Sequence, residues 1–177
     1  MRVLALGGIR SGKSQWAEAA ISRAAASGEV RYVATGAMSD GPEWAARVAT
    51  HRLRRPDRWS TVESTDVATH LRTGPEVPTL VDDVGGWLVA AMDRRDAWTG
   101  GDVTPDVDDL VAAVGEFRGP LALVSPEVGL TVVPATESGR RFADALGTLN
   151  QHLAAVCDEV VLVIAGQPLT VKGRPST

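Results

Sequence analysis

The segment GGIRSGKS at residues 7–14 constrains the fold more than any other part of the sequence. It matches the pattern G-x-x-x-x-G-K-[ST] and lies between the apolar run RVLAL at 2–6 and an Ala-rich stretch with helical periodicity at 13–26. Glycines in such a loop let successive backbone N–H groups point at a phosphate, and the following helix adds the positive end of its dipole. The segment therefore predicts a strand–loop–helix unit that holds phosphates.

Two side chains of the loop have distinct expected roles. Lys13 is expected to reach the β- and γ-phosphates of a nucleoside triphosphate, and the Ser14 hydroxyl is expected to ligate Mg²⁺. Arg10 offers a further cation. The alternative is a glycine-rich turn that matches the pattern by chance, and the strand and helix around the loop argue against it.

An acidic residue is expected at the end of a neighbouring strand, close to the metal ion. The run TLVDD at 79–83 supplies Asp82 and Asp83 after an apolar stretch. An acid there is costly unless it holds a cation or caps the following helix. We favour Asp82 over Asp83 as the residue related to Mg²⁺, and helix capping is the alternative role for this pair.

The remaining pattern predicts a single α/β domain over residues 1–173, followed by a short tail at 174–177. Apolar strand candidates alternate with helix candidates, which indicates a mostly parallel sheet flanked by helices on both faces. The expected strands are 2–6, 31–35, 79–83, 121–125, 159–165 and an edge strand at 169–172. The expected helices are 13–26, 42–54, 85–94, 106–117 and 138–156.

Composition excludes several other classes of protein. The formal net charge of -4 argues against a general binder of nucleic acid or of membrane surfaces. A single cysteine, Cys157, permits no internal disulfide and fits a reducing compartment. The first residues are already strand-like and leave no room for a signal peptide, and the run VVLVIAG is too short to span a bilayer. We therefore expect a cytoplasmic protein with no membrane span and no nucleic-acid partner.

The second feature is a basic helix in an otherwise acidic chain. Residues 42–59 contain His51 among several arginines, and Arg47 and His51 share one helical face. Neighbouring cations disfavour the charged imidazole, which leaves His51 a neutral nucleophile while the arginines hold a triphosphate. The alternative is a solvated basic face with an incidental histidine, and composition alone favours it.

With both features in view, the sequence resembles one family, the bifunctional adenosylcobinamide kinase and adenosylcobinamide-phosphate guanylyltransferase of cobalamin biosynthesis. The resemblance covers nearly the whole chain. It rests on GGIRSGKSQWAE at the start, YVATG at 32–36, AARVATHRLRRPDRWSTVE at 45–63, LVDD at 80–83 and a long block at 127–172. That block contains E-V-G-x-x-x-V-P, R-x-F-x-D-x-x-G-x-x-N-Q and D-x-V-x-L-x-x-x-G-x-P, which discriminate between families better than the phosphate loop does.

The resemblance implies an enzyme with two activities. It would phosphorylate the hydroxyl of the aminopropanol arm of adenosylcobinamide with ATP or GTP, and then transfer GMP from GTP to adenosylcobinamide phosphate through a histidine adduct, releasing pyrophosphate. The resemblance also implies a RecA-like P-loop NTPase domain that assembles as a homotrimer. Two alternatives remain: a P-loop small-molecule kinase without nucleotidyl transfer, and a non-catalytic nucleotide-binding regulatory subunit.

The same resemblance implies which residues do this chemistry. His51 matches the nucleophile, and Thr50 stands where the family often has a second histidine. Lys13 is the other expected catalytic residue, and Ser14 and Asp82 are the expected Mg²⁺ residues. The implied nucleotide contacts are Gly7, Gly8, Ile9, Arg10, Ser11, Gly12, Lys13, Ser14, Ala34, Thr35, Gly36, His51, Arg52, Leu53, Arg54, Glu63 and Asp82. His70 and His152 are expected to have surface or interface roles instead.

Overall fold

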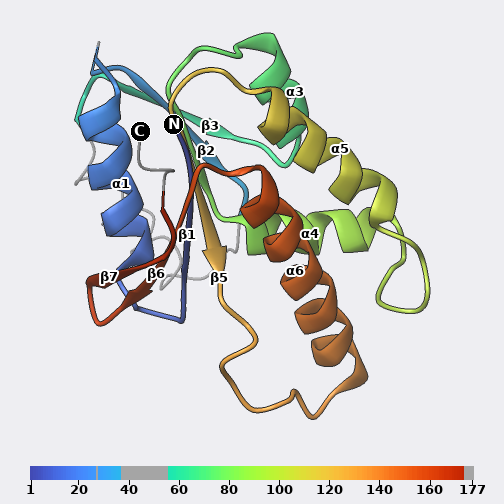
Figure 1. Cartoon of the computed structure of the whole chain (residues 1–177). Helices are drawn as coiled ribbons and strands as arrows, with labels where there is room; N and C mark the ends of the chain where they lie inside the picture. Colours follow the sequence, from blue (N-terminus) through green and yellow to red (C-terminus); the bar gives the residue numbers. More distant parts are fainter. Residues whose placement is uncertain (27, 37–55, 174–177) are drawn as a thin grey trace.

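The computed structural model describes residues 1–26, 28–36 and 56–173. They form a layered arrangement of one sheet and five helices (Figure 1). The strands are β1 (Arg2–Gly7), β2 (Val30–Ala34), β3 (Trp59–Glu63), β4 (Thr79–Asp82), β5 (Leu121–Pro126), β6 (Glu159–Ile164) and β7 (Gln167–Lys172). The helices are α1 (Lys13–Ala24), α3 (Val67–Thr73), α4 (Val84–Arg94), α5 (Thr104–Glu116) and α6 (Glu137–Val156).

The sheet has the strand order β3-β2-β4-β5-β1-β6-β7. Neighbouring strands from β3 to β6 pair in parallel, and only β7 is antiparallel, paired with β6. Parallel strands need helical crossovers, which cover the sheet and bury its residues on both faces. Strand β5 accordingly has five fully buried positions in a row, Leu121 to Ser125.

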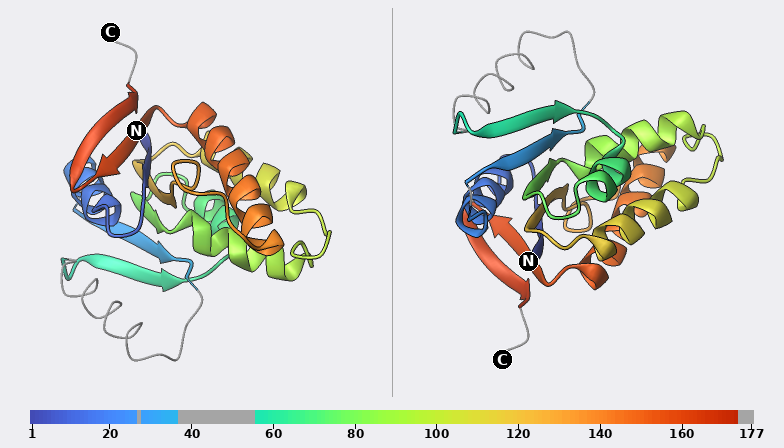
Figure 2. Two further views of the ribbon diagram at one scale, coloured as in Figure 1. Left: turned by 90° about the horizontal axis from the view of Figure 1, so that it is seen from below. Right: turned by 90° about the horizontal axis from the view of Figure 1, so that it is seen from above.

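Two apolar cores lie on the two faces of the sheet. Among the helices that the structure describes, α1 covers one face, and α3, α4, α5 and α6 gather on the opposite face (Figures 1 and 2). Alternate residues of β1 divide between these cores: Val3 and Ala5 pack towards Ile21 of α1, whereas Leu4 packs in the cluster that contains Leu146 of α6. This alternation follows from the two-residue period of a strand.

The predicted architecture is confirmed. The expected strands are all present with boundaries that differ by one or two residues, and four of the expected helices are present with similarly small differences. The fifth, at 42–54, lies outside the described residues. No helix in the described ranges is both long enough and apolar enough to cross a membrane.

Two elements were not predicted, β3 and α3. Strand β3 lies at the sheet edge and exposes Ser60, Thr61 and Glu63, so its sequence WSTVE lacks the apolar run by which the other strands were found. Helix α3 has only seven residues, too few for a clear helical period. Its start is marked by Asp66, whose carboxylate accepts a hydrogen bond from the Thr69 amide.

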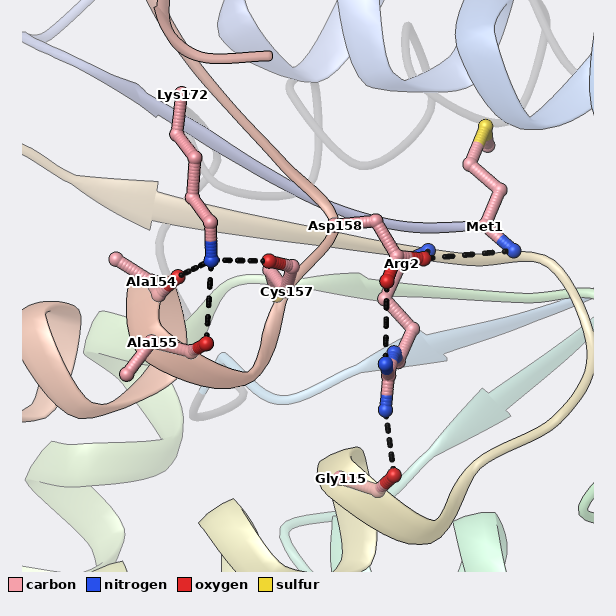
Figure 3. A network of polar contacts seen from close by, with 8 residues as sticks. All are labelled: Met1, Arg2, Gly115, Ala154, Ala155, Cys157, Asp158 and Lys172. Atoms are coloured by element: carbon pink, nitrogen blue, oxygen red, sulfur yellow. Dashed lines mark hydrogen bonds and ion pairs between the residues drawn. The ribbon is translucent and has the colours of Figure 1, made fainter. Parts of the chain in front are cut away.

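Polar contacts anchor the C-terminal strand, which forms the other edge of the sheet, and the N-terminus, at the start of β1 (Figure 3). The Lys172 ammonium on β7 donates hydrogen bonds to the carbonyls of Ala154, Ala155 and Cys157, at 2.8, 3.1 and 2.7 Å. These carbonyls lie at the C-terminal end of α6, where a cation is favoured by the helix dipole. Next to them, Asp158 accepts hydrogen bonds from the Arg2 amide and guanidinium.

Replacing Lys172 by methionine is expected to lower the free energy of unfolding by about 1–2 kcal/mol, because the last carbonyls of α6 lose a charged donor. Urea unfolding followed by circular dichroism measures this change. The matched control is Arg141→Met, which removes an exposed ion pair with Glu137 one turn away on α6. That control is expected to cost about 0.5 kcal/mol or less. An equal loss for both variants would contradict the role of Lys172 as a helix cap.

Candidate nucleotide and phosphate site

The phosphate loop joins β1 to α1, and two of its glycines are required for different reasons. Gly12, which begins α1 as its N-cap, has φ +92°, a left-handed conformation that favours glycine. A β-carbon on Gly7 would collide with Ser11 Oγ and would lie 2.7 Å from the carbonyl oxygen of Val163. The loop therefore needs glycine at one position for its backbone angle and at the other for space.

The turn between β6 and β7 supports this loop from the far end of the sequence. The Gly166 amide donates a hydrogen bond to the Ser11 carbonyl at 2.7 Å, and a β-carbon on Gly12 would lie 3.1 Å from the Gly166 α-carbon. Gly166 is the glycine of the D-x-V-x-L-x-x-x-G-x-P element. The contact gives a physical reason for that element which no local sequence pattern reveals.

The lysine and the serine of the loop both make polar contacts beside it. Lys13 Nζ donates a hydrogen bond to the Gly8 carbonyl at 3.1 Å, so its ammonium lies over the loop. Ser14 Oγ donates to Asp82 Oδ1 at 3.4 Å. The structure thus brings the first turn of α1 and the end of β4 together, although β5 separates β4 from β1 in the sheet.

Tyr32 is a site residue that the sequence reasoning missed. Its hydroxyl donates a hydrogen bond to Asp82 Oδ2 at 2.7 Å, and its side chain is buried against Trp59, with ring centroids 6.5 Å apart. Asp82 is therefore fixed through both carboxylate oxygens. The available signal was slight: Tyr32 is the one tyrosine of the chain and precedes the segment ATG at 34–36.

The neighbouring acid, Asp83, has a different partner. Its carboxylate accepts a hydrogen bond from the Gly86 amide at 2.6 Å and caps α4. Burial raises the pKa of the Asp83 carboxyl, while the hydrogen bond from Gly86 opposes that rise. Of the two roles considered for the pair, capping belongs to Asp83, whereas Asp82 contacts the phosphate loop.

Parallel register places other expected contacts along the same edge of the sheet. Ala34 at the end of β2 is paired with Glu63 on one side and with Asp82 on the other. Thr35 follows directly, and its amide donates to the Asp82 carbonyl at 3.1 Å while its hydroxyl donates to the Asp83 carbonyl. A β-carbon on Gly86 would lie 3.1 Å from the Gly36 α-carbon, so Gly36 lies against the start of α4.

Glu63 is not close to the phosphate loop. Four inter-strand spacings separate β3 from β1, which corresponds to about 19 Å at the usual distance between strands. A ligand group bound by Lys13 and one bound by Glu63 would therefore belong either to distant parts of one nucleotide or to two different molecules.

The side chains beside the loop fit a magnesium ion. Ser14 and Asp82 supply hard oxygen donors, and Mg²⁺ is usually held by one or two carboxylates together with substrate phosphates. Such a site needs no larger cluster of protein ligands. Within residues 1–26, 28–36 and 56–173 there is no group of three or more His, Cys, Asp or Glu side chains that would bind a metal ion without the nucleotide.

The remaining candidate residues are exposed on the loop, lie on other helices, or lie outside the described residues. Ile9 and Arg10 are exposed on the loop, with Arg10 at φ +57°. His152 is exposed on α6, and His70 lies on α3, away from the phosphate loop. The expected nucleophile and its neighbours lie outside the described residues: His51, Arg52, Leu53 and Arg54.

Asp83→Ala is expected to lower the free energy of unfolding by about 1 kcal/mol, the usual effect of losing an N-cap. Asp83→Asn is expected to stay near the wild type, because the asparagine oxygen still accepts from Gly86. Chemical unfolding of the two variants checks this difference. Equal destabilisation by alanine and asparagine would contradict the capping role.

Three curated relatives match almost the entire chain. The bifunctional adenosylcobalamin biosynthesis protein CobP of Pseudomonas aeruginosa is 41% identical over 179 residues, which covers 99% of each chain. The bifunctional adenosylcobalamin biosynthesis protein CobU of Escherichia coli is 35% identical over 192 residues, covering 97% of this chain and 100% of the relative. The protein of the same name from Salmonella typhimurium has the same identity and coverage.

Comparison with solved structures finds the P4 protein from bacteriophage phi6 in complex with ADP, with a TM-score of 0.49 and 15% identity, covering 98% of this chain and 56% of that one. The family described as "Cobinamide kinase / cobinamide phosphate guanyltransferase" matches residues 3–171. That match and the full-length relatives show that the chain belongs to the cobinamide kinase / cobinamide phosphate guanyltransferase family.

Proposed function

We propose that this chain phosphorylates adenosylcobinamide with ATP or GTP and then transfers GMP from GTP to the resulting phosphate. The observation that carries the proposal is the meeting of Ser14 and Asp82 beside the Lys13 loop, in a chain that belongs to this family. The similar proteins are also named as bifunctional.

In the first reaction the substrate hydroxyl attacks the γ-phosphorus and releases its proton to solvent, and the bond from that phosphorus to the bridging oxygen of the leaving nucleoside diphosphate breaks. Catalysis of this step depends mainly on positioning and on neutralising charge. Lys13 contributes a cation at the phosphates, and the backbone amides of 7–14 contribute further donors. When bound by Ser14 and Asp82, Mg²⁺ would neutralise negative charge on the phosphate oxygens.

In the second reaction the imidazole of His51 attacks the α-phosphorus of GTP and pyrophosphate leaves. The phosphate of adenosylcobinamide phosphate then attacks the same phosphorus, the phosphorus–nitrogen bond breaks, and adenosylcobinamide-GDP forms. An imidazole adduct divides one difficult displacement into two easier ones. This role for His51 rests on the resemblance of the segment ATHRLRR to the family, as do the roles of Arg52, Leu53 and Arg54.

The remaining nucleotide contacts are proposed along the carboxyl edge of the sheet. Residues 7–14 would hold phosphates, and Ala34, Thr35 and Gly36 would line the path towards Glu63. A carboxylate at Glu63 suits the hydroxyls of a ribose or the donors of a guanine. The distance of β3 from β1 supports a role for Glu63 away from the reacting γ-phosphate.

The assembly and location of the chain are also proposals. We place it in the cytoplasm, as a single catalytic domain over 1–173 with a short tail, assembled as a homotrimer. The hairpin of β6 and β7 supports self-association, because it exposes Ile164 at the end of β6 and Leu169 and Val171 on the edge strand β7. Exposed apolar edge strands are usually covered by a partner.

Lys13→Ala is expected to lower the rate of cobinamide phosphorylation by about 100-fold or more, because a cation is removed from the site of charge development. Phosphate transfer from γ-labelled ATP or GTP to cobinamide measures it. Arg141→Met is the control, since it removes a cation from an exposed ion pair on α6. A regulatory subunit without turnover would give no product with the wild type.

Incubation with α-³²P-GTP is expected to label the wild type with an acid-labile, alkali-stable GMP group, as a phosphorus–nitrogen bond requires. His51→Ala is expected to abolish the label, whereas His70→Ala and His152→Ala, at the two other histidines of the chain, are expected to keep it. If the wild type phosphorylates cobinamide but takes no label, the chain is a kinase without nucleotidyl transfer.

A further inference from the structure

A cavity of about 520 Å³ lies beside the phosphate loop, on the face of the sheet that α6 covers. This volume is typical of small-molecule sites. Leu6, the residue before the loop, lines the cavity, and so does Glu127, whose amide donates a hydrogen bond to the Gly7 carbonyl at 3.1 Å. The cavity therefore begins where the loop begins, at the carboxyl ends of β1 and β5. Ligands of open parallel sheets bind at this edge.

The buried side chain of Asn150 gives this cavity a polar wall. Its oxygen accepts a hydrogen bond from the Ser125 hydroxyl at 2.6 Å, and its nitrogen donates to the Pro126 carbonyl at 3.0 Å. A primary amide can make four hydrogen bonds, so one N–H and one oxygen lone pair remain after these two. Asn150 is thus held in place by the end of β5 while it lines the cavity.

The charges around the cavity do not suit the triphosphate of a nucleotide. Two acids line it, Glu127 and Asp144, and Arg140 is the one cation in its lining. That guanidinium donates to the carbonyls of Pro134 and Ala135, at 3.1 and 2.9 Å. With its one cation paired to these carbonyls, the lining offers little to hold a triphosphate. Carboxylate and amide groups instead pair well with the hydroxyls and amides of an uncharged ligand.

The rim of the cavity is apolar and exposed. Leu130, Val132 and Val133 in the loop between β5 and α6 are 76%, 88% and 74% exposed, and Val133 also lines the cavity. Figure 1 shows this loop extending beyond the carboxyl end of β5. Leu130 and Val132 alternate with lining residues of this loop, and exposed apolar side chains next to a hollow are typical of a ligand groove.

We propose that this cavity binds the hydroxyl-bearing arm of cobinamide, and that the corrin ring rests on the apolar rim formed by Leu130, Val132 and Val133. The assignment rests on the proposed function, which requires an acceptor alcohol close to the phosphate loop. A neutral arm with amide and hydroxyl groups matches the cavity wall, and a large ring edged with methyl groups matches the rim. The E-V-G and N-Q elements of the sequence then have a substrate to contact.

Gly147→Leu tests the assignment without disturbing the loop. Gly147 lines the cavity from α6, and a β-carbon there would meet no atom within 4 Å, so a leucine would extend into empty space. Removing a glycine from a helix also favours folding. The matched control is Thr148→Leu, which adds leucine at the next, exposed position of α6. Val133→Asp, on the exposed rim, is a second variant that leaves the core unchanged.

The readouts are the Kd of cobinamide by equilibrium dialysis, the Kd of a non-hydrolysable nucleotide, and the GMP label formed without cobinamide. Gly147→Leu is expected to weaken cobinamide binding by about tenfold or more. Val133→Asp is expected to weaken it in the same direction. Both variants should keep wild-type nucleotide affinity and labelling, and Thr148→Leu should keep all three values.

Wild-type cobinamide affinity in Gly147→Leu would overturn the assignment while leaving the proposed function intact. Light scattering then tests whether the cavity is instead an interface between copies of this chain. That alternative requires a changed molar mass in Gly147→Leu together with unchanged cobinamide affinity. If the wild type neither binds cobinamide nor phosphorylates it, the proposed function fails, and the assignment fails with it.

Discussion

The rest of the structure depends on one constraint, the parallel pairing of the six strands numbered β1 through β6. It aligns the carboxyl ends of these strands along one edge of the sheet, so each loop that leaves a strand there faces the same side. The phosphate loop follows β1, Asp82 ends β4, Ala34 ends β2 and Glu127 follows β5. A nucleotide and its acceptor can then meet although these residues are far apart in the sequence.

At this edge of the sheet, the adjacent residues Asp82 and Asp83 have different roles because they have different hydrogen-bond partners. Asp82 is held by the hydroxyls of Ser14 and Tyr32, so both carboxylate oxygens are positioned beside the phosphate loop. Asp83 is turned towards the first amides of α4 and caps that helix. The sheet also positions the phosphate loop, since the amide of Gly166, in the turn between β6 and β7, donates a hydrogen bond to the Ser11 carbonyl. The nucleotide site is thus supported from both ends of the chain.

A feature of the fold or the site could be predicted when the residues that specify it are close together in the sequence. The loop at 7–14 was predictable because its glycines, lysine and serine act through consecutive backbone and side-chain groups. The long helix α6 and the apolar strands were predictable because burial on one or both faces leaves a clear period. Strand β3 was missed because an edge strand can pair through its backbone while its side chains stay polar. Tyr32 was missed because its contact with Asp82 depends on the register of two strands.

The sequence by itself determined the phosphate loop and the alternation of strands and helices, because both depend on neighbouring residues. It also determined the family, because the match covers nearly the full length of the chain. Only the tertiary structure decided which of two adjacent acids contacts the loop, that Tyr32 and Gly166 support the site, and that the E-V-G and N-Q elements line one cavity. These facts depend on strand order and register. They arise when the buried faces of distant segments pack together, and no local pattern specifies that packing.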